Sequence, residues 1–454
     1  MKKLWQKNWQ LNKTIEAFET KGDLILDQKL VTYDVLGSLA HAKGLKKIGI
    51  LSDEELQLLT KGLQAIVLLD KQGAFTLQLG DEDIHTKIEN YLTEIYGDVG
   101  KKIHTGRSRN DQVLTAIRLF TKDKLLCIWE ELFELIAALL AFSWKHVDVL
   151  LPGYTHMQKA MPSTVGMWSG AIAEGLLDNL LLLKTAYQLN DQSPLGSGAG
   201  YGIPLPLDRE YTAKLLGFTK VQRNSLYCQN ARGKIEAIVL SALIAILQDV
   251  NKLATDALLF TTNEFGFFDV DQTLCSGSSI MPQKKNVDIA ELLRSKVHVL
   301  LGNYTQIVSM STNLPSGYNR DLQDSKKPLV ESLETVNDSL KVATLLVKNI
   351  SVNFEKIHTA LTPELFATHQ AMKLVKQGVA FRDAYQEAGK NLTNTTYSLT
   401  HVLQESSHIG GIGNLGLAQL AHQFGVEQKY LNVEKRKWKT AQAKLLKGGD
   451  IHEK

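Results

Sequence analysis

Proline is scarce in this sequence. Only nine of the 454 residues are proline, well below the average usage of about 5%. None lies before Pro152, between Pro206 and Pro282, or after Pro363. A proline inside a helix removes a hydrogen bond and clashes with the preceding turn. Its absence from such long stretches therefore leaves room for very long helices.

Cysteine, excess charge and long apolar runs are scarce as well. The three cysteines lie far apart and form no CxxC pair, which favours a reducing compartment. The formal net charge of +3 gives no general argument for nucleic acid or an anionic membrane as partner. The longest uncharged apolar run, Ala237 to Leu247, is too short to span a bilayer, and the N-terminus lacks the apolar core of a signal peptide. We expect a cytoplasmic protein that binds neither nucleic acid nor membrane.

Helix formers, in contrast, are abundant. Leu, Ala, Lys, Glu and Gln dominate long tracts, and few alternating β-branched runs interrupt them. Apolar residues recur at helical spacing in five segments, at about 111–148, 166–190, 233–264, 288–311 and 328–352. We predict an all-α protein with three domains: an N-terminal helical domain over 1–105, a central bundle of long helices over 106–355, and a C-terminal helical domain over 356–454.

The segment from 234 to 260 is apolar on nearly every face through its first half. A helix of this kind must be surrounded by other elements. The centre of a large monomeric bundle would satisfy that need, and so would a bundle completed by helices from neighbouring subunits. We favour the second arrangement, an oligomer.

The segment HTGRSRNDQV precedes a predicted long helix, which Ser108, Asn110 or Asp111 could cap. Arg107 and Arg109 would then stand beside the positive end of the helix dipole, where exposed amides favour an anion. A ligand that bears a carboxylate would fit there. An ordinary N-cap with solvated arginines explains the pattern equally well.

The segment GYTHMQKAMP, residues 153–162, contains a histidine in a polar break bounded by prolines. His156 could act as an acid or base near neutral pH, although a lone histidine near a helix start is more often structural. Thr155 beside it favours the functional interpretation. So does Glu291, on a later predicted helix, which could orient and charge the imidazole.

Two further segments are weaker on their own. The segment EDIHTKIEN, residues 82–90, predicts a helix start with His85 in its first turn. In GYNRDLQDSKK, Tyr318, Gln323 and Lys326 are spaced by five and three residues, so the last two share a face and could hydrogen-bond a polar ligand. A hydrated connection between helices explains this second segment equally well.

The segment CSGSSIMPQKKN, residues 275–286, crowds small, hydroxyl and basic residues into one break. Gly277 gives backbone freedom and Ser278 follows it, while Lys284 and Asn286 are donors suited to holding negative charge. No aromatic residues interleave with the lysines and no basic stripe surrounds them, which argues against nucleic acid as the ligand.

Several separated segments together resemble one family. GSSIMPQKKN is similar to the signature loop of the fumarase and aspartase superfamily, and HTGRSRNDQV is similar to its argininosuccinate lyase branch. DVLGSLAHA, GYTHMQKAMPS, SPLGSGAGYG, GYNRDLQDSKK and GVAFRDAYQEAG match that branch in order, over most of the chain. The signature loop alone indicates the superfamily, whereas GRSRNDQ separates this branch from fumarases, aspartases and adenylosuccinate lyases.

The resemblance implies reversible elimination of argininosuccinate to arginine and fumarate without a metal or organic cofactor, in a homotetramer whose sites each draw on three subunits. It also implies a base, Ser278, two groups that stabilise the carbanion, Lys284 and Asn286, and an acid or proton relay, His156 paired with Glu291. Other proposals for the family make this histidine the base. The substrate-binding positions that it implies are Ser108, Arg109, Asn110, Thr155, Tyr318, Gln323 and Lys326, with His85 nearby.

The chain departs from the family pattern in places. Asp23 stands where most relatives have a serine that contacts the arginine end of the substrate, and Asp27 is kept four residues later. We hypothesise that Asp23 meets the substrate amino group by charge; an Asp23→Asn enzyme with unchanged KM would exclude this. Arg232 is kept, but Ala231 and Gly233 replace the aspartates that usually surround it.

Three readings of the sequence follow. The first is an argininosuccinate lyase, the second a sibling lyase that eliminates a different amine from a succinyl group, and the third a catalytically silent structural relative. Drift in a silent relative would be expected to remove at least one member of the motif set. The sequence retains all of them: Thr155, His156, Ser278, Lys284, Asn286 and Glu291.

Overall fold

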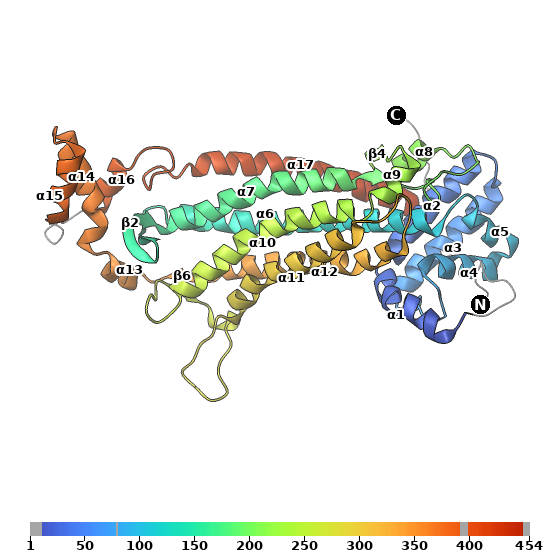
Figure 1. Ribbon diagram of the computed structural model, residues 1–454, viewed down its shortest axis with the longest axis horizontal. Helices are drawn as coiled ribbons and strands as arrows, with labels where there is room; N and C mark the ends of the chain where they lie inside the picture. Colours follow the sequence, from blue (N-terminus) through green and yellow to red (C-terminus); the bar gives the residue numbers. More distant parts are fainter. Residues whose placement is uncertain (1–10, 79, 391–397, 448–454) are drawn as a thin grey trace.

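The computed structural model describes residues 11–78, 80–390 and 398–447. The molecule is elongated, with compact groups of helices at its two ends and long helices between them (Figure 1). The described strands are short and pair into three two-stranded sheets. The prediction of an all-α protein is confirmed.

Five long helices form the central bundle and run along the long axis of the molecule (Figure 1). α10 packs against α7, α11 and α12, and α6 packs against α7 and α12. The five helices predicted from the apolar spacing are confirmed to within a few residues, except that two ends differ by about four. The bundle helices are α6 (Arg109–Lys145), α7 (Val165–Asn190), α10 (Lys234–Phe260), α11 (Asp288–Ser311) and α12 (Lys326–Lys348).

α10 is the core helix of the bundle. Leu240, Leu243 and Leu247 are fully buried, as the apolar first half of the helix requires. Among the described residues, α10 is the one helix long and apolar enough, by length and composition, to cross a membrane. Its packing against three other helices accounts for that composition, and 56% of its most apolar window is buried within the chain.

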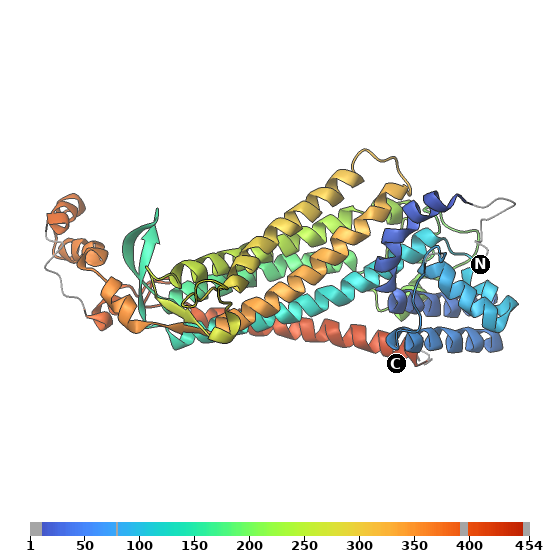
Figure 2. The same cartoon turned by 90° about the horizontal axis from the view of Figure 1, so that it is seen from below.

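The N-terminal end is a cluster of shorter helices around the start of α6 (Figure 2). α2 is buried along most of its length, whereas α1 buries only Thr20, Leu24 and Asp27. α3 begins in a capping box made by Ser52 and Glu55. These elements are α1 (Lys13–Gln28), α2 (Val31–Lys47), α3 (Asp53–Lys71), α4 (Ile84–Tyr96), α5 (Asp98–Lys101) and η1 (Lys102–His104).

Short elements between the long helices complete this end. β3 pairs with β4 in parallel, and the 3-10 helix η3 leads directly into α12. These elements are β3 (Gln192–Ser193), α8 (Arg209–Leu215), β4 (Lys220–Val221), α9 (Ser225–Asn230) and η3 (Arg320–Ser325).

The opposite end carries two antiparallel strand pairs and several short helices. The first pair is a hairpin between α6 and α7, and the second lies beside the loop that joins α10 to α11. The elements of this end are β1 (Leu150–Thr155), β2 (Gln158–Thr164), β5 (Phe268–Val270), η2 (Gln272–Leu274), β6 (Ile350–Val352), α13 (Phe354–Ala360), η4 (Pro363–Phe366), α14 (Ala367–Lys376), α15 (Phe381–Lys390) and α16 (Leu399–Glu405).

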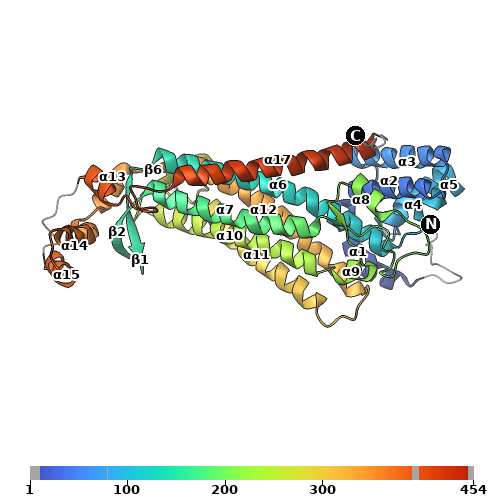
Figure 3. The ribbon, with the colours of Figure 1, turned by 90° about the horizontal axis from the view of Figure 1, so that it is seen from above.

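The last helix, α17 (Leu417–Leu446), returns along the bundle to the N-terminal end (Figure 3). It packs against α6 and α7, with Leu431 and Trp438 buried. The C-terminal segment is thus divided between the short helices of one end and a long helix beside the bundle. The division into domains 1–105, 106–355 and 356–454 stays a prediction.

Candidate functional site

A polar pocket at the N-terminal end gathers most of the predicted substrate-binding residues. It has a volume of about 160 Å³ and is formed by α1, the start of α4, the start of α6 and the segment around η3. Parts of the chain about 300 residues apart meet here, since Lys326 contacts Asp27. Its predicted members are Asp23, Asp27, His85, Arg109, Asn110, Tyr318, Gln323 and Lys326.

Ser108 caps α6, beside the pocket. Its hydroxyl accepts from the Asn110 amide at 3.3 Å, and its own amide donates to Asp111 Oδ1 at 2.9 Å. The other Asp111 oxygen accepts from the amides of Gly196 and Gly198, both at 3.0 Å. Of the three capping residues the sequence allowed, Ser108 is the cap and Asp111 completes a capping box. This network fixes where Arg109 and Asn110 enter the pocket.

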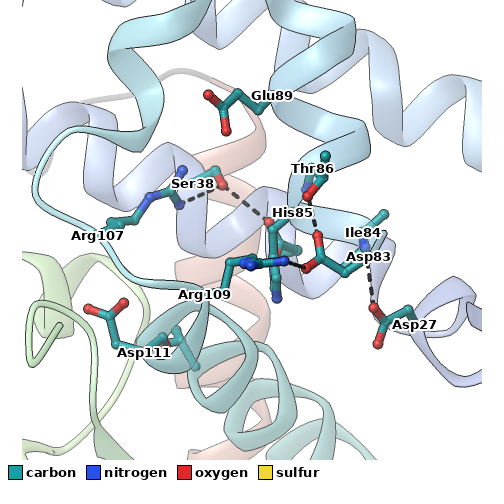
Figure 4. A network of polar contacts seen from close by, with 12 residues as sticks. Asp27, Ser38, Asp83, Ile84, His85, Thr86, Glu89, Arg107, Arg109 and Asp111 are labelled. Carbon is teal, nitrogen blue, oxygen red and sulfur yellow. Dashed lines mark hydrogen bonds and ion pairs between the residues drawn. The ribbon is translucent and has the colours of Figure 1, made fainter. Parts of the chain in front are cut away.

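Arg109 stands where the two helix starts meet (Figure 4). Its guanidinium pairs with Glu82 and, at 3.2 Å, with Asp83. Burial alone would lower the pKa of Arg109, but the two carboxylates outweigh it and raise that pKa. Asp83 also caps α4 by accepting from the Thr86 amide at 2.7 Å. The guanidinium is therefore oriented from the α4 side of the pocket.

His85 is buried and bonded through Nδ1 to Asp34 of α2. Burial would lower the pKa of His85, but the charge and hydrogen bond of Asp34, with help from Asp83 and Asp27, raise it to about 9. His85 is therefore an imidazolium at neutral pH. Its charge faces the carboxylates at the start of α4.

Lys326 lies at the back of the pocket and is 3% exposed. Its Nζ is 2.6 Å from Asp23 and 2.7 Å from Asp27. Burial would lower the pKa of Lys326, but these two carboxylates raise it. The second Asp27 oxygen accepts from the Ile84 amide at 3.2 Å (Figure 4). In this structure Asp23 pairs with Lys326, and its contact with a substrate amino group stays a prediction.

Several pocket residues were not among the predicted site residues. Asp83 could have been found as the cap of a predicted helix start. Arg320, which pairs with Glu19 at 3.3 Å, gave no local signal because its partner lies about 300 residues away. The residues missed are Glu19, Thr20, Glu82, Asp83, Val113, Arg232 and Arg320.

Thr155 and His156 lie at the tip of the β1–β2 hairpin, at the other end of the molecule. Thr155 pairs with Gln158, so His156 and Met157 form a two-residue turn. Both have positive φ, 52° and 61°. Hairpin turns of this kind favour Asn and Gly, because other side chains are strained there. The exposed His156 side chain is thus held in a conformation that costs free energy, a feature common at functional positions.

The signature-loop residues lie in an exposed loop between η2 and α11, which extends away from the bundle (Figure 1). The backbones of Ser276 and Asn286 form a bridge at the base of the loop. The Ser278 hydroxyl oxygen accepts from the amides of Ile280 and Met281, at 3.3 and 3.1 Å. Lys284 is exposed at the turn. The structure therefore brings Ser278, Lys284 and Asn286 into one loop.

Long helices separate the predicted residues of one chain. α6 begins at Arg109 of the pocket and ends just before the hairpin of His156. α11 begins beside Glu291 and ends just before the segment of Tyr318. Its 24 residues correspond to about 36 Å. Within the described part of the chain, no hydrogen bond or ion pair joins His156 to Glu291, so their pairing stays a prediction.

Comparison with known proteins identifies the family to which the chain is similar. Residues 9–302 match the model of the Lyase family. The chain is 44% identical to argininosuccinate lyase of Thermotoga neapolitana, over 85% of this chain and 96% of that protein. It is 42% identical to argininosuccinate lyase of Parabacteroides distasonis, over 91% and 92% of the two chains.

Solved structures share the fold at low sequence identity. EDDS lyase in complex with formate superposes with a TM-score of 0.81 at 23% identity, covering 97% of this chain and 95% of that one. The helical fold and the match over residues 9–302 define the protein as a lyase. The sequence identity above 40% to two argininosuccinate lyases, over most of each chain, then identifies the family within this class. The chain belongs to the argininosuccinate lyase family, as its motifs predicted.

Proposed function

We propose that the protein is an argininosuccinate lyase, which reversibly eliminates arginine from argininosuccinate to leave fumarate. The observation that carries this proposal is 44% identity to an enzyme of that name over 85% of the chain. The mixed charge of the pocket, with carboxylates and cations facing one another, supports an amino-acid ligand. We further propose that the enzyme acts in the cytoplasm, in arginine biosynthesis.

The proposed reaction starts at the succinyl part of the substrate. Ser278, as an alkoxide, takes the proton from the carbon next to a carboxylate, and the electron pair left behind makes that carboxylate an aci-carboxylate with two negative charges. Donors aimed at this charge lower the barrier, and we assign that role to Lys284 and Asn286. The amides of Ile280 and Met281, which donate to Ser278 Oγ, support the base role because such donors stabilise an alkoxide.

The second half of the reaction breaks the carbon–nitrogen bond. The electron pair of the aci-carboxylate forms the double bond of fumarate, and the nitrogen leaves with the guanidinium group of arginine. We assign delivery of the proton to the leaving nitrogen to His156, with Glu291 as the group that orients it. The strained turn that holds His156 supports a functional role for this side chain.

The proposed working form is a homotetramer whose sites combine the pocket of one copy with the hairpin and the loop of others. The separation of these three groups along α6 and α11 supports this arrangement. Exposed apolar residues on the outer faces of the bundle support it as well, because such surface favours association. They include Leu181 and Leu182 of α7 and Leu292 and Leu301 of α11.

Fumarate absorbance tests the proposed substrate. The purified protein is expected to produce fumarate from argininosuccinate, and from none of aspartate, malate and adenylosuccinate when each is supplied separately. Turnover of aspartate or adenylosuccinate, without turnover of argininosuccinate, would favour a sibling lyase, whereas turnover of malate would indicate elimination of water and contradict the proposed substrate. No turnover of any would favour a silent relative.

Replacing Ser278 by alanine tests the proposed base. We expect a loss of at least about 10²-fold in kcat, because a positioned base contributes roughly 10²–10⁴-fold. The half-exposed loop position predicts an unchanged unfolding temperature and oligomeric state. Ser279→Ala, the matched control at the neighbouring serine, is expected to retain most activity. A Ser278→Ala enzyme within tenfold of the parent would exclude the role.

A further inference from the structure

Among the residues that the structure describes, the cations that line the pocket are paired with carboxylates, with one exception. The pairs are His85 with Asp34, Arg109 with Glu82 and Asp83, Arg320 with Glu19, and Lys326 with Asp23 and Asp27. Arg232 lines the same pocket. Its Nε, Nη1 and Nη2 find no hydrogen-bond partner among the described residues.

Arg232 is held firmly in this unpaired state. It lies on the turn between α9 and α10 and is 2% exposed. The next residue, Gly233, has φ of +82°, and a Cβ there would come within 2.7 Å of the Ser311 side chain. The guanidinium carbon lies 5.4 Å from the centre of the Tyr318 ring. The turn therefore fixes the backbone beside Arg232, and the Tyr318 ring packs against the guanidinium.

The carboxylates near Arg232 make no hydrogen bond with its guanidinium. Arg118 and Glu236 are buried close by, and neither Glu236 oxygen accepts a hydrogen bond from the described residues. Burial lowers the pKa of Arg118, the charge of Arg232 lowers it further, and Glu236 opposes both. Burial raises the pKa of Asp23 and the charge of Arg232 acts to lower it, but the Asp23 carboxylate is paired with Lys326. Because a buried charge without a hydrogen-bonded partner is strongly destabilising, the orphaned guanidinium of Arg232 indicates a partner that the described residues do not supply.

We propose that Arg232 binds the α-carboxylate of the arginine part of the substrate, and that the Tyr318 ring moves aside to admit it. This rests on the proposed function. A guanidinium can hold a carboxylate through two parallel hydrogen bonds. Lys326 is the alternative cation, but its ammonium already has two carboxylate partners, Asp23 and Asp27. The succinyl carboxylates are assigned to the loop of another copy.

Arginine and agmatine provide the test, since agmatine is arginine without the α-carboxylate. Calorimetry on the full-length assembled protein is expected to show that the parent binds arginine about 10- to 100-fold more tightly than agmatine, as a charge-assisted pair predicts. In the Arg232→Met variant the affinities for arginine and agmatine are expected to differ by no more than about threefold, mainly because arginine binds more weakly. Arg232→Lys should keep part of the preference for arginine.

Three controls separate binding from structure. Arg320→Gln removes a guanidinium from the same pocket that is already paired and 56% exposed, and we expect it to retain the preference. Ligand-free Arg232→Met should unfold at a temperature no lower than the parent, because no ion pair is lost. The fumarate KM in the reverse reaction should be unchanged.

Each contrary result has a definite meaning. An Arg232→Met protein that still binds arginine more tightly than agmatine by the parental factor overturns the inference. So does one whose fumarate KM rises while its preference for arginine is unchanged. Argininosuccinate turnover by the parent is measured in the same preparation. If the parent turns over argininosuccinate but the Arg232→Met variant keeps the parental preference for arginine over agmatine, only the role of Arg232 is contradicted. If the parent neither turns over argininosuccinate nor binds arginine, the proposed function is contradicted as well.

Discussion

At the scale of single residues, the pocket is a set of buried charges with specific partners. His85 shows how strongly a partner can act: burial would make its imidazole neutral, yet Asp34 holds it charged with a pKa of about 9. His104, nearby but flanked by Arg107 and Arg109, has the opposite environment. Burial and these positive charges lower the pKa of His104 to about 4. Two histidines in one region thus carry different charges at neutral pH.

The raised pKa of His85 predicts a loss of stability in mild alkali. The imidazolium stabilises the fold fully below the unfolded-state pKa of about 6.5, and this contribution is lost as the pH rises through the folded-state pKa of about 9. The loss approaches about 3 kcal/mol. Thermal unfolding of the parent should therefore move to lower temperature between pH 6.5 and pH 9.5.

Asp34→Asn is the control for this prediction. It removes the carboxylate that raises the pKa of His85, so the variant should be less stable at pH 6.5 but nearly insensitive to pH over the same interval. A parent with a flat profile, or a variant with the same slope as the parent, would contradict the assignment.

Single residues also show how far the sequence could predict the site. Tyr318, Gln323, Lys326 and His85 were assigned through family motifs, and they share one pocket. The unpaired state of Arg232 could not be predicted, because it depends on which carboxylates reach the pocket from α1 and α4. Such pairings join residues far apart in the chain, as Glu19 and Arg320 do. Local patterns carry no information about them.

At the scale of elements, long helices were predictable and short hairpins were not. Proline gaps and apolar spacing located α6, α7, α10, α11 and α12, since both signals are local. Pro152 and Pro162, which bound a predicted break in the sequence, instead lie opposite each other in the β1–β2 hairpin. An isolated two-stranded sheet consists of edge strands only, where a missing amide hydrogen is tolerated.

The turn of this hairpin yields a prediction on stability. Met157 has φ of 61° and is 68% exposed, so glycine at this position relieves strain without emptying a core. We expect Met157→Gly to raise the free energy of unfolding by about 0.5–1 kcal/mol, measured by denaturant titration. Met161→Gly, in strand β2 of the same hairpin, should lower it instead. A Met157→Gly protein less stable than the parent would show that the turn is not strained.

At the scale of the whole molecule, the long helices of the bundle separate the pocket from the loop of Ser278 in the same chain. α10 has 27 residues, which correspond to about 40 Å. It begins beside Arg232, and its far end leads to the loop of Ser278. A side chain spans only a fraction of that length. The proposed site therefore requires a second copy whose far end lies against the pocket of the first.

Mixing two inactive variants tests this assembly. His156→Asn damages the hairpin and Ser278→Ala damages the loop, so each alone should be nearly inactive. If the two groups come from different copies, random mixed tetramers should contain about one intact site in four and recover about a quarter of the parental activity. Coexpression of the two chains with different tags, followed by double affinity purification, provides the sample. No recovery would mean that one copy supplies both groups.

The length of α10 has a further consequence for how the protein behaves on dilution. When the working parts of a site belong to separate copies, turnover per chain depends on how many copies remain associated. Activity should then fall with concentration even while each chain keeps its helices. The quantity that limits such an enzyme in a dilute solution is the affinity of one bundle for the next.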